Sequence, residues 1–183
     1  MAARRARASP DGKPSPMTEA PELPDLSPDD CHPRAAAALA DPFFWSLTDE
    51  TAPFGNETAH ETLTAFRDFR DEHPKKSPIE LLDALLERWE VGNAGWDAVD
   101  AAEVEALGEE DEYGLLTRDE AILALAFSQI VVEGRLDPEV RRRALLALAR
   151  QALPALLSAY EGRALERALR IDRMRGILSA RWD

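Results

Sequence analysis

The sequence predicts an all-α protein, folded as a single compact bundle of about seven helices. Three observations lead to this prediction. Apolar residues recur at spacings of three and four along most of the chain, which is the period of an amphipathic helix. Several of these segments begin with the capping residues Ser, Thr or Asp, followed by Pro or by a later Glu. No segment alternates regularly between apolar and polar residues, and no Asn-Gly hairpin turn is present.

Length and composition predict one domain preceded by a tail. The chain has 183 residues, enough for one domain with a sizeable core. Residues 1–29 are rich in Pro, Ser, Asp and small residues, so we expect a disordered tail there. The helical domain is then expected over residues 30–183. Met17 is an alternative translation start, which would shorten the tail.

The first two expected helices are short. An Ala-rich segment over residues 33–40 comes first. Asp41 and Pro42 then open the second helix, because Asp is a good N-cap and Pro is tolerated at the first helical position. A Phe-Phe-Trp sequence follows directly. It contributes to a stretch of thirty residues that holds six of the twelve aromatic residues of the chain.

Two longer helices are expected next. The first begins with Thr58 or Asn56 as alternative N-caps and ends near Pro74, since the residue before proline avoids helical angles. The second begins in a capping box at Ser77 and ends at Gly92.

The second half of the chain contains the most apolar segment. A weaker helix is expected over residues 97–107, followed by a charged loop over residues 108–114. Thr117 then opens a third capping box. The helix that follows, residues 121–132, is hydrophobic nearly all round and should lie inside the bundle. A helix that starts at Asp137 and a last pair of helices complete the expected fold.

Charge is unevenly distributed along the chain. The net charge is -13. Residues 97–139 include thirteen acids and two bases, whereas residues 140–183 include four acids and ten arginines. One interpretation is that these groups neutralise each other within the fold, and the alternative is that one face binds a charged partner. The overall acidity argues against a nucleic-acid partner, because phosphate binding usually needs a dominant basic surface.

Other features indicate a cytoplasmic protein. Cys31 is the only cysteine, so the sequence predicts no disulfide framework and no cysteine metal cluster. No uncharged apolar run approaches the length of about 18 residues that a membrane span requires. The first arginines are not followed by the apolar segment of an export signal. We therefore expect a cytoplasmic location and no membrane partner.

The first candidate site is a polar joint between helices, residues 49–56. A Pro-Phe-Gly turn lies there between acids and an amide, which is more specific than a connector requires. We expect a positive φ at Gly55, and we expect Trp45 and Phe54 to be largely buried beneath the acids. The candidate binding residues of the joint and the following helix are Asp49, Glu50, Phe54, Gly55, Asn56, Glu57 and His60.

A metal site at the joint is a weaker possibility. Glu57 and His60 have the Glu-x-x-His spacing of di-iron bundles. Such sites need a second pair of this kind, and neither of the other two histidines follows a glutamate at this spacing. A mononuclear site with Asp49 and Glu50 is the remaining alternative, whereas the simpler interpretation gives His60 a packing role and Glu57 a role at the helix N-terminus. We therefore assign no metal ligand and no cofactor.

Motifs of common enzymes are missing from the sequence. There is no nucleophile elbow and no Gly-rich nucleotide loop, and Thr64 stands where a zinc protease would have its second histidine. Cys31 and His32 are adjacent at the edge of the tail, which does not make a catalytic dyad. A paired-carboxylate site at Asp49 and Glu50 would require burial that the sequence does not indicate. The sequence favours a non-enzymatic protein, and no catalytic residue is assigned.

The second candidate surface is the charged loop around Tyr113. Its acids either dock a basic protein or remain solvated. They are Glu109, Glu110, Asp111 and Glu112.

The segment from His32 to Arg70 resembles the YfeS-like family of small uncharacterised bacterial proteins. The similar features are an early His-Pro, the Phe-Phe-Trp, the Asp-Glu-x-Ala-Pro-Phe-Gly joint and the Arg-rich end of the next helix. Residues 126–153 look similar as well. The resemblance implies a bacterial, cytosolic, mainly helical protein, and it carries over no catalytic residue. Asn56-Glu57-Thr58 replaces a more acidic run of the family joint, which weakens the metal alternative.

Two hypotheses of function follow. The first is a non-enzymatic adaptor-like or immunity-like domain that recognises a basic protein through its acidic face. The alternative is a small-molecule or metal site at residues 49–60. Nucleic-acid binding by the arginines near the C-terminus ranks last.

Overall fold

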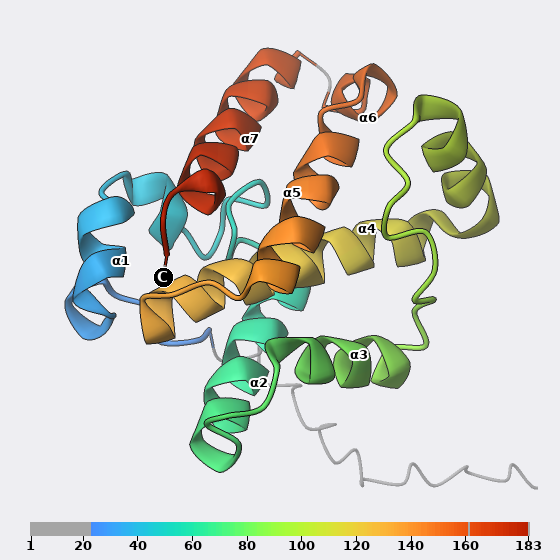
Figure 1. Cartoon of the computed structure of the whole chain (residues 1–183). Coiled ribbons are helices and arrows are strands. Elements are labelled where there is room, and N and C mark those ends of the chain that lie inside the picture. The colour runs from blue at the N-terminus through green and yellow to red at the C-terminus, as the bar shows by residue number, and fades with distance from the viewer. Residues whose placement is uncertain (1–22, 161, 183) are drawn as a thin grey trace, which may run out of the picture.

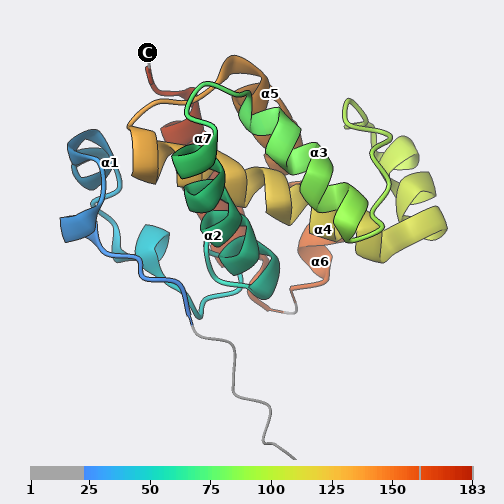
Figure 2. The same ribbon diagram turned by 90° about the horizontal axis from the view of Figure 1, so that it is seen from below.

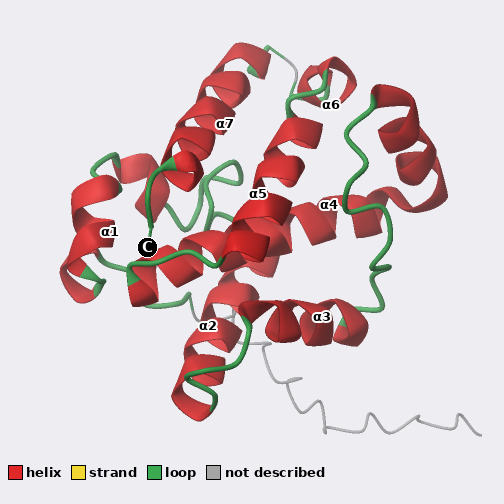
Figure 3. Cartoon of the chain, viewed as in Figure 1, coloured by secondary structure: helices red, strands yellow, loops and turns green. Residues whose placement is uncertain are grey.

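The computed structural model describes residues 23–160 and 162–182 of the chain (Figure 1). The described residues form seven α-helices and two 3-10 helices and contain no strand, which confirms the all-α prediction (Figure 3). The 3-10 helices are η1 (Pro28–Asp30) and η2 (Pro42–Trp45). The α-helices are α1 (Pro33–Ala38), α2 (Glu57–Glu72), α3 (Pro78–Arg88), α4 (Ala101–Glu133), α5 (Pro138–Gln151), α6 (Pro154–Ser158) and α7 (Ala164–Ser179).

The predicted tail falls mainly on residues 1–22, which lie outside the described residues. The rest of it, residues 23–29, runs into η1, where the side chain of Ser27 accepts a hydrogen bond from the backbone of Asp29. None of the described helices combines the length and the apolar character that crossing a bilayer would require.

α4 is the central helix of the fold. From Thr117 to Val131 nearly all of its side chains are buried, as expected for a helix that is apolar all round. α2 and α3 pack on one side of α4 and α5 packs on the other, while α7 packs against α5 (Figures 1 and 2). Phe127 of α4 stacks on Phe44 of η2 with ring centroids 5.6 Å apart.

The prediction of a loop at residues 108–114 is wrong, because α4 continues through these residues with a kink. Asp111 alone leaves helical geometry, and its Oδ1 accepts a hydrogen bond from the backbone N–H of Gly114 at 2.8 Å. Asp111 is thus the N-cap of the second part of the helix. The second part therefore begins directly after Asp111, earlier than the start predicted at Thr117. Thr117, the predicted start, lies buried within the helix.

The other helix ends are partly as predicted. Ser77 and Glu80 form the expected capping box of α3. The end of α3 was predicted incorrectly at Gly92: Glu90 adopts the left-handed conformation (φ 58°), and Val91 N–H donates to the carbonyl of Leu86 at 2.9 Å. A non-glycine residue therefore closes this helix in a Schellman-type arrangement.

A buried ion pair fixes α5 on α4. Arg150 of α5 is fully buried, and its Nη2 lies 2.6 Å from Oδ1 of Asp119, which is also buried. Arg150 Nη1 donates to the backbone carbonyls of Trp96 and Ala98 at 2.8 and 3.0 Å. One guanidinium thereby joins α5, α4 and the segment that leads into α4. Its charge and most of its donors are satisfied, as a buried ion requires.

Ion pairing distinguishes two sets among the thirteen acids of residues 97–139. Three of them pair with arginines of residues 140–183, which is the neutralisation considered from the sequence: Asp97, Asp119 and Glu139. Glu133 pairs instead with Arg70 and Arg135. Five glutamates near the start of α4 form no ion pair with another described residue: Glu103, Glu105, Glu109, Glu110 and Glu112. The second set gives this end of the molecule its free negative charge.

Candidate functional site

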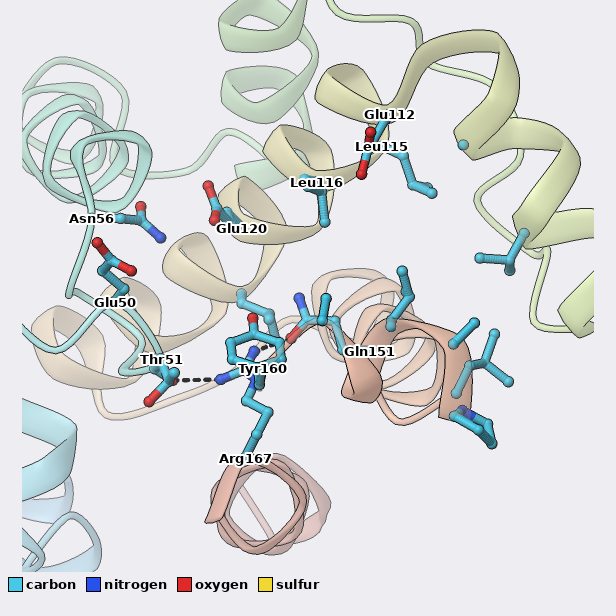
Figure 4. A pocket seen from close by; sticks show the side chains of 18 of the residues that line it. Glu50, Thr51, Asn56, Glu112, Leu115, Leu116, Glu120, Gln151, Tyr160 and Arg167 are labelled. Atoms are coloured by element: carbon cyan, nitrogen blue, oxygen red, sulfur yellow. Dashed lines mark hydrogen bonds between the residues drawn. The ribbon is translucent and has the colours of Figure 1, made fainter. Parts of the chain in front are cut away.

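A cavity of about 800 Å³ lies between the joint, α4, the α5–α6 junction and α7 (Figure 4). Its walls are largely apolar. The apolar lining includes Val104, Leu115, Leu123, Leu153, Leu156 and Met174. The charged and polar lining includes Glu50, Thr51, Asn56, Glu105, Glu109, Glu112, Glu120, Gln151, Tyr160 and Arg167. The two candidate surfaces expected from the sequence therefore contribute to the wall of one cavity.

The joint is a compact turn that is held by close backbone packing and by one buried aromatic side chain. Phe54 is fully buried and anchors the turn in the core, as expected, while Trp45 is only half-buried and donates from Nε1 to the carbonyl of Leu39 at 2.6 Å. The positive φ expected at Gly55 is not found. Gly55 is required for a different reason: a Cβ at this position would overlap the backbone carbonyl of Asp49.

Asp49 serves the joint itself. Its carboxylate accepts hydrogen bonds from the backbone and the hydroxyl of Thr51, at 3.1 and 2.7 Å, and pairs with Arg170 of α7 at 2.7 Å. Burial acts to raise the pKa of Asp49, but the hydrogen bonds from Thr51 and the charge of Arg170 outweigh it and lower the pKa. The carboxylate therefore stays ionised and connects the joint to α7.

Thr51 and Asn56 belong to the joint and also line the cavity. Asn56 is the N-cap of α2, and its Oδ1 accepts a hydrogen bond from Ala59 N–H at 2.9 Å, so the alternative cap Thr58 does not take this position. The carbonyl of Thr51 faces α7 and accepts from Arg167. Glu50 is exposed at the cavity edge close to Asn56 (Figure 4).

Glu120 brings a half-buried carboxyl to the same wall (Figure 4). Burial, first of all, raises the pKa of Glu120; hydrogen bonding by Thr58 and the charge of Arg167 oppose this, and the charges of Asp119 and then Glu50 add to the rise. Two carboxyl groups thus influence each other here. A cation bound between the two carboxylates would offset the desolvation cost of Glu120 and the repulsion between Glu120 and Glu50.

Arg167 extends from α7 to the centre of the site (Figure 4). It is 6% exposed. Its Nη1 donates to the Thr51 carbonyl at 2.8 Å, its Nη2 donates to Oε1 of Gln151, and its guanidinium carbon lies 5.3 Å from the centre of the Tyr160 ring. Burial lowers the pKa of Arg167. All three close partners are neutral.

The structure assigns different places to the predicted site residues. Those that line the cavity are Glu50, Asn56, Glu109 and Glu112. Those that build the turn or the kink instead are Asp49, Phe54, Gly55 and Asp111. Glu57 and Glu110 are exposed and do not line the cavity, and His60 Nε2 lies 3.2 Å from the Leu47 carbonyl. In residues 23–160 and 162–182 no group of three or more His, Cys, Asp or Glu is arranged to hold a metal ion.

Sequence reasoning missed Glu120, Gln151, Tyr160 and Arg167. Arg167 had a signal of its own: Ile171, Met174 and Leu178 follow it at helical spacing and form the buried face of α7. An arginine in register with that apolar face is expected to point inward. From the sequence alone, Arg167 was not distinguished from the other arginines near the C-terminus.

The comparisons with known proteins find one distant similarity. No protein-family profile and no solved structure match the chain. The chain is 26% identical over 125 residues to the uncharacterised protein YfeS of Escherichia coli K12, and the match covers 68% of this chain. The chain spans about half the length of that relative, 51%. The resemblance to YfeS-like proteins expected from the His32–Arg70 segment is confirmed as a distant similarity.

Proposed function

We propose that this protein binds, without transforming it, a positively charged organic molecule with an apolar body in the cavity between the joint and α7. The observation that carries the proposal is the cavity itself, with its largely apolar walls and several carboxylates. Its volume of about 800 Å³ lies within the range of ligand sites. Apolar walls suit the body of such a ligand, and a few polar groups set its orientation.

The charge of the wall sets the sign of the ligand. Five glutamates and one arginine line the cavity. Carboxylates around a low-dielectric concave surface concentrate negative potential and attract cations. None of these five glutamates forms an ion pair with another described residue, so a cationic ligand would supply a missing partner.

Binding rather than catalysis is supported by the choice of side chains. The described residues that line the cavity include no histidine, cysteine, serine or lysine. The wall thus lacks a serine or cysteine nucleophile and a histidine base, the commonest pair in nucleophilic catalysis. The single cysteine of the chain, Cys31, supports a cytoplasmic place of action.

Octylamine is a suitable first probe, because it combines an ammonium group with an apolar chain. Calorimetric titration should show saturable binding that weakens with salt, and octanol should bind more weakly. Glu50→Gln and Glu112→Gln should each reduce the octylamine affinity. The matched control Glu87→Gln, at an exposed position of α3 away from the cavity, should not. Equal binding of octanol and octylamine, or an equal loss in the Glu87→Gln control, would contradict the proposal.

A basic protein partner is the second candidate function, and a specific surface favours it. Glu103 and Glu110 are exposed in the first part of α4, and after the kink Tyr113 is 73% exposed and Leu116 is 42% exposed. Acids around exposed apolar groups suit a basic, partly apolar protein segment. An arginine-rich peptide is the probe: its binding should fall with salt and with the double change Glu103→Lys, Glu110→Lys. Binding that survives this charge reversal would exclude the surface.

A further inference from the structure

The buried arginines of the structure differ in how their charges are compensated. Arg150 pairs with Asp119 at 2.6 Å, and Arg70 pairs with Glu133 at 2.9 Å. Arg118 forms no ion pair with a described residue, but its guanidinium lies 5.0 Å from the Trp96 ring centre and does not line the cavity. Arg167 is the buried arginine that both lines the cavity and has no carboxylate within ion-pair distance among the described residues.

Arg167 also keeps unused hydrogen-bonding capacity. A guanidinium has five N–H donors. Two of them donate to the Thr51 carbonyl and to Gln151, and the buried Nε has no hydrogen-bond partner among the described residues. A buried cation whose close partners are all neutral costs free energy, and hydrogen-bond donors without partners add to that cost. A ligand anion at this point would offset both.

The partners of Arg167 hold it in place rather than neutralise it. Thr51 belongs to the joint, and Gln151 lies at the end of α5. Tyr160 covers one face of the guanidinium. Three separate parts of the chain therefore position one cationic group in an otherwise acidic cavity (Figure 4). A planar, pre-positioned guanidinium is well suited to a carboxylate, which it can bind through two parallel hydrogen bonds.

We infer that the ligand of this cavity is zwitterionic: a carboxylate at one end is held by Arg167, and an ammonium at the other end is held by the glutamates of the wall. This inference rests on the proposed function, which supplies the ammonium end, and extends it to the opposite end of the molecule. The apolar body between the two charges packs on the leucines that line the cavity. The ligand class is an amphiphilic amino acid with its two charges separated by an aliphatic chain.

Three probes with the same chain separate the two ends: octylamine, octanoate and ω-aminooctanoate. Calorimetric titration into the unmodified protein should show ω-aminooctanoate binding about tenfold more tightly than octylamine, the gain expected for a hydrogen bond to a charged group. Without a cation to receive it, the added carboxylate would be repelled by the glutamates and would weaken binding. The sign of the difference therefore decides the question without any variant.

Variants of α7 then locate the effect. Arg167→Gln should remove the tenfold advantage of ω-aminooctanoate and should not weaken octylamine binding, because octylamine has no carboxylate for Arg167 to hold. Arg167→Lys should retain part of the advantage. Arg175→Gln is the matched control, since Arg175 is half-buried on the same helix, does not line the cavity and pairs with Asp172. Its affinities should equal those of the unmodified protein.

The possible outcomes distinguish the inference from the proposed function. Octylamine that binds as tightly as ω-aminooctanoate, or more tightly, overturns the zwitterion while the cation site stands. Octanoate that binds while octylamine does not would overturn the cation site and leave an anion site at Arg167. An advantage of ω-aminooctanoate that persists in Arg167→Gln would also overturn the inference, because another group would then hold the carboxylate.

Discussion

Arg150 and Arg167 are both buried arginines, yet their surroundings assign them different roles. Arg150 is enclosed by Asp119 and by the carbonyls of Trp96 and Ala98, so its charge is neutralised within the fold. Arg167 has a carbonyl, an amide and an aromatic ring as close partners, and it borders a cavity. The comparison teaches that burial alone does not distinguish a structural ion from a binding group. The identity of the partners and access to a cavity do.

The largest expected effect comes from breaking the compensated pair. Asp119→Asn leaves the Arg150 charge buried without its counter-ion, so the free energy of unfolding should fall by about 3–5 kcal/mol. Urea denaturation measures this. The double variant Asp119→Leu, Arg150→Met should recover much of the loss, because it removes both charges together. A loss below about 1 kcal/mol in Asp119→Asn would mean that the pair is not structural.

A middle-sized effect is expected from the joint that positions Arg167. Gly55→Val places a side chain against the Asp49 carbonyl, which should cost about 1–3 kcal/mol or somewhat more by overpacking. Gly176→Ala is the matched control, because Gly176 lies in α7 with open space around its Cβ position, and it should be neutral or stabilising. Equal stability of Gly55→Val and the unmodified protein would show that the joint relaxes without cost.

A smaller, pH-dependent effect is expected at Glu120. Burial raises the pKa of Glu120 above the ordinary value of 4.5, so the folded state holds this proton more tightly than the unfolded state does. The resulting cost is absent below the ordinary pKa and is complete above the folded pKa. Glu120→Gln should therefore stabilise the protein at pH 7 and have little effect near pH 4.

Thermal unfolding at the two pH values measures the effect of Glu120→Gln. Glu87→Gln, at an exposed position of α3, should change the melting temperature little at either pH. If Glu120→Gln is less stable than the unmodified protein at pH 7, the neighbours of the carboxylate, Thr58 and Arg167, stabilise it by more than burial destabilises it.

Much of the fold was predictable because its signals are local. The capping box at Ser77 and the Asp-Pro starts at Asp41 and Asp137 lie next to the helices that they open. The kink at Asp111 was missed because a run of acids between two glycines also matches a loop, and only the hydrogen bond to Gly114 N–H shows which applies. The end of α3 was missed because a glutamate took the left-handed position that glycine usually takes.

The site was less predictable because it depends on tertiary packing. Glu50 and Asn56 were singled out from the joint, and Glu109 and Glu112 from the acidic segment. Nothing in their spacing shows that α4 brings the two groups to one cavity. The opposite wall comes from the α5–α6 junction and α7, far along the chain. Asp49 shows the converse: a carboxylate that looked available in the sequence is used by Thr51 and Arg170.

The most direct test combines both properties in one variant. Arg167→Gln removes a buried charge that has no carboxylate within ion-pair distance in the part of the chain that the structure describes. Its free energy of unfolding should therefore change by at most about 1.5 kcal/mol, the net contribution of a hydrogen bond. In the same variant, the affinity for ω-aminooctanoate should fall about tenfold, to that of octylamine. This combination of retained stability and lost carboxylate recognition is the result that we predict. A loss of stability as large as that of Asp119→Asn, with the preference for ω-aminooctanoate over octylamine unchanged, would show that Arg167 is a structural ion like Arg150.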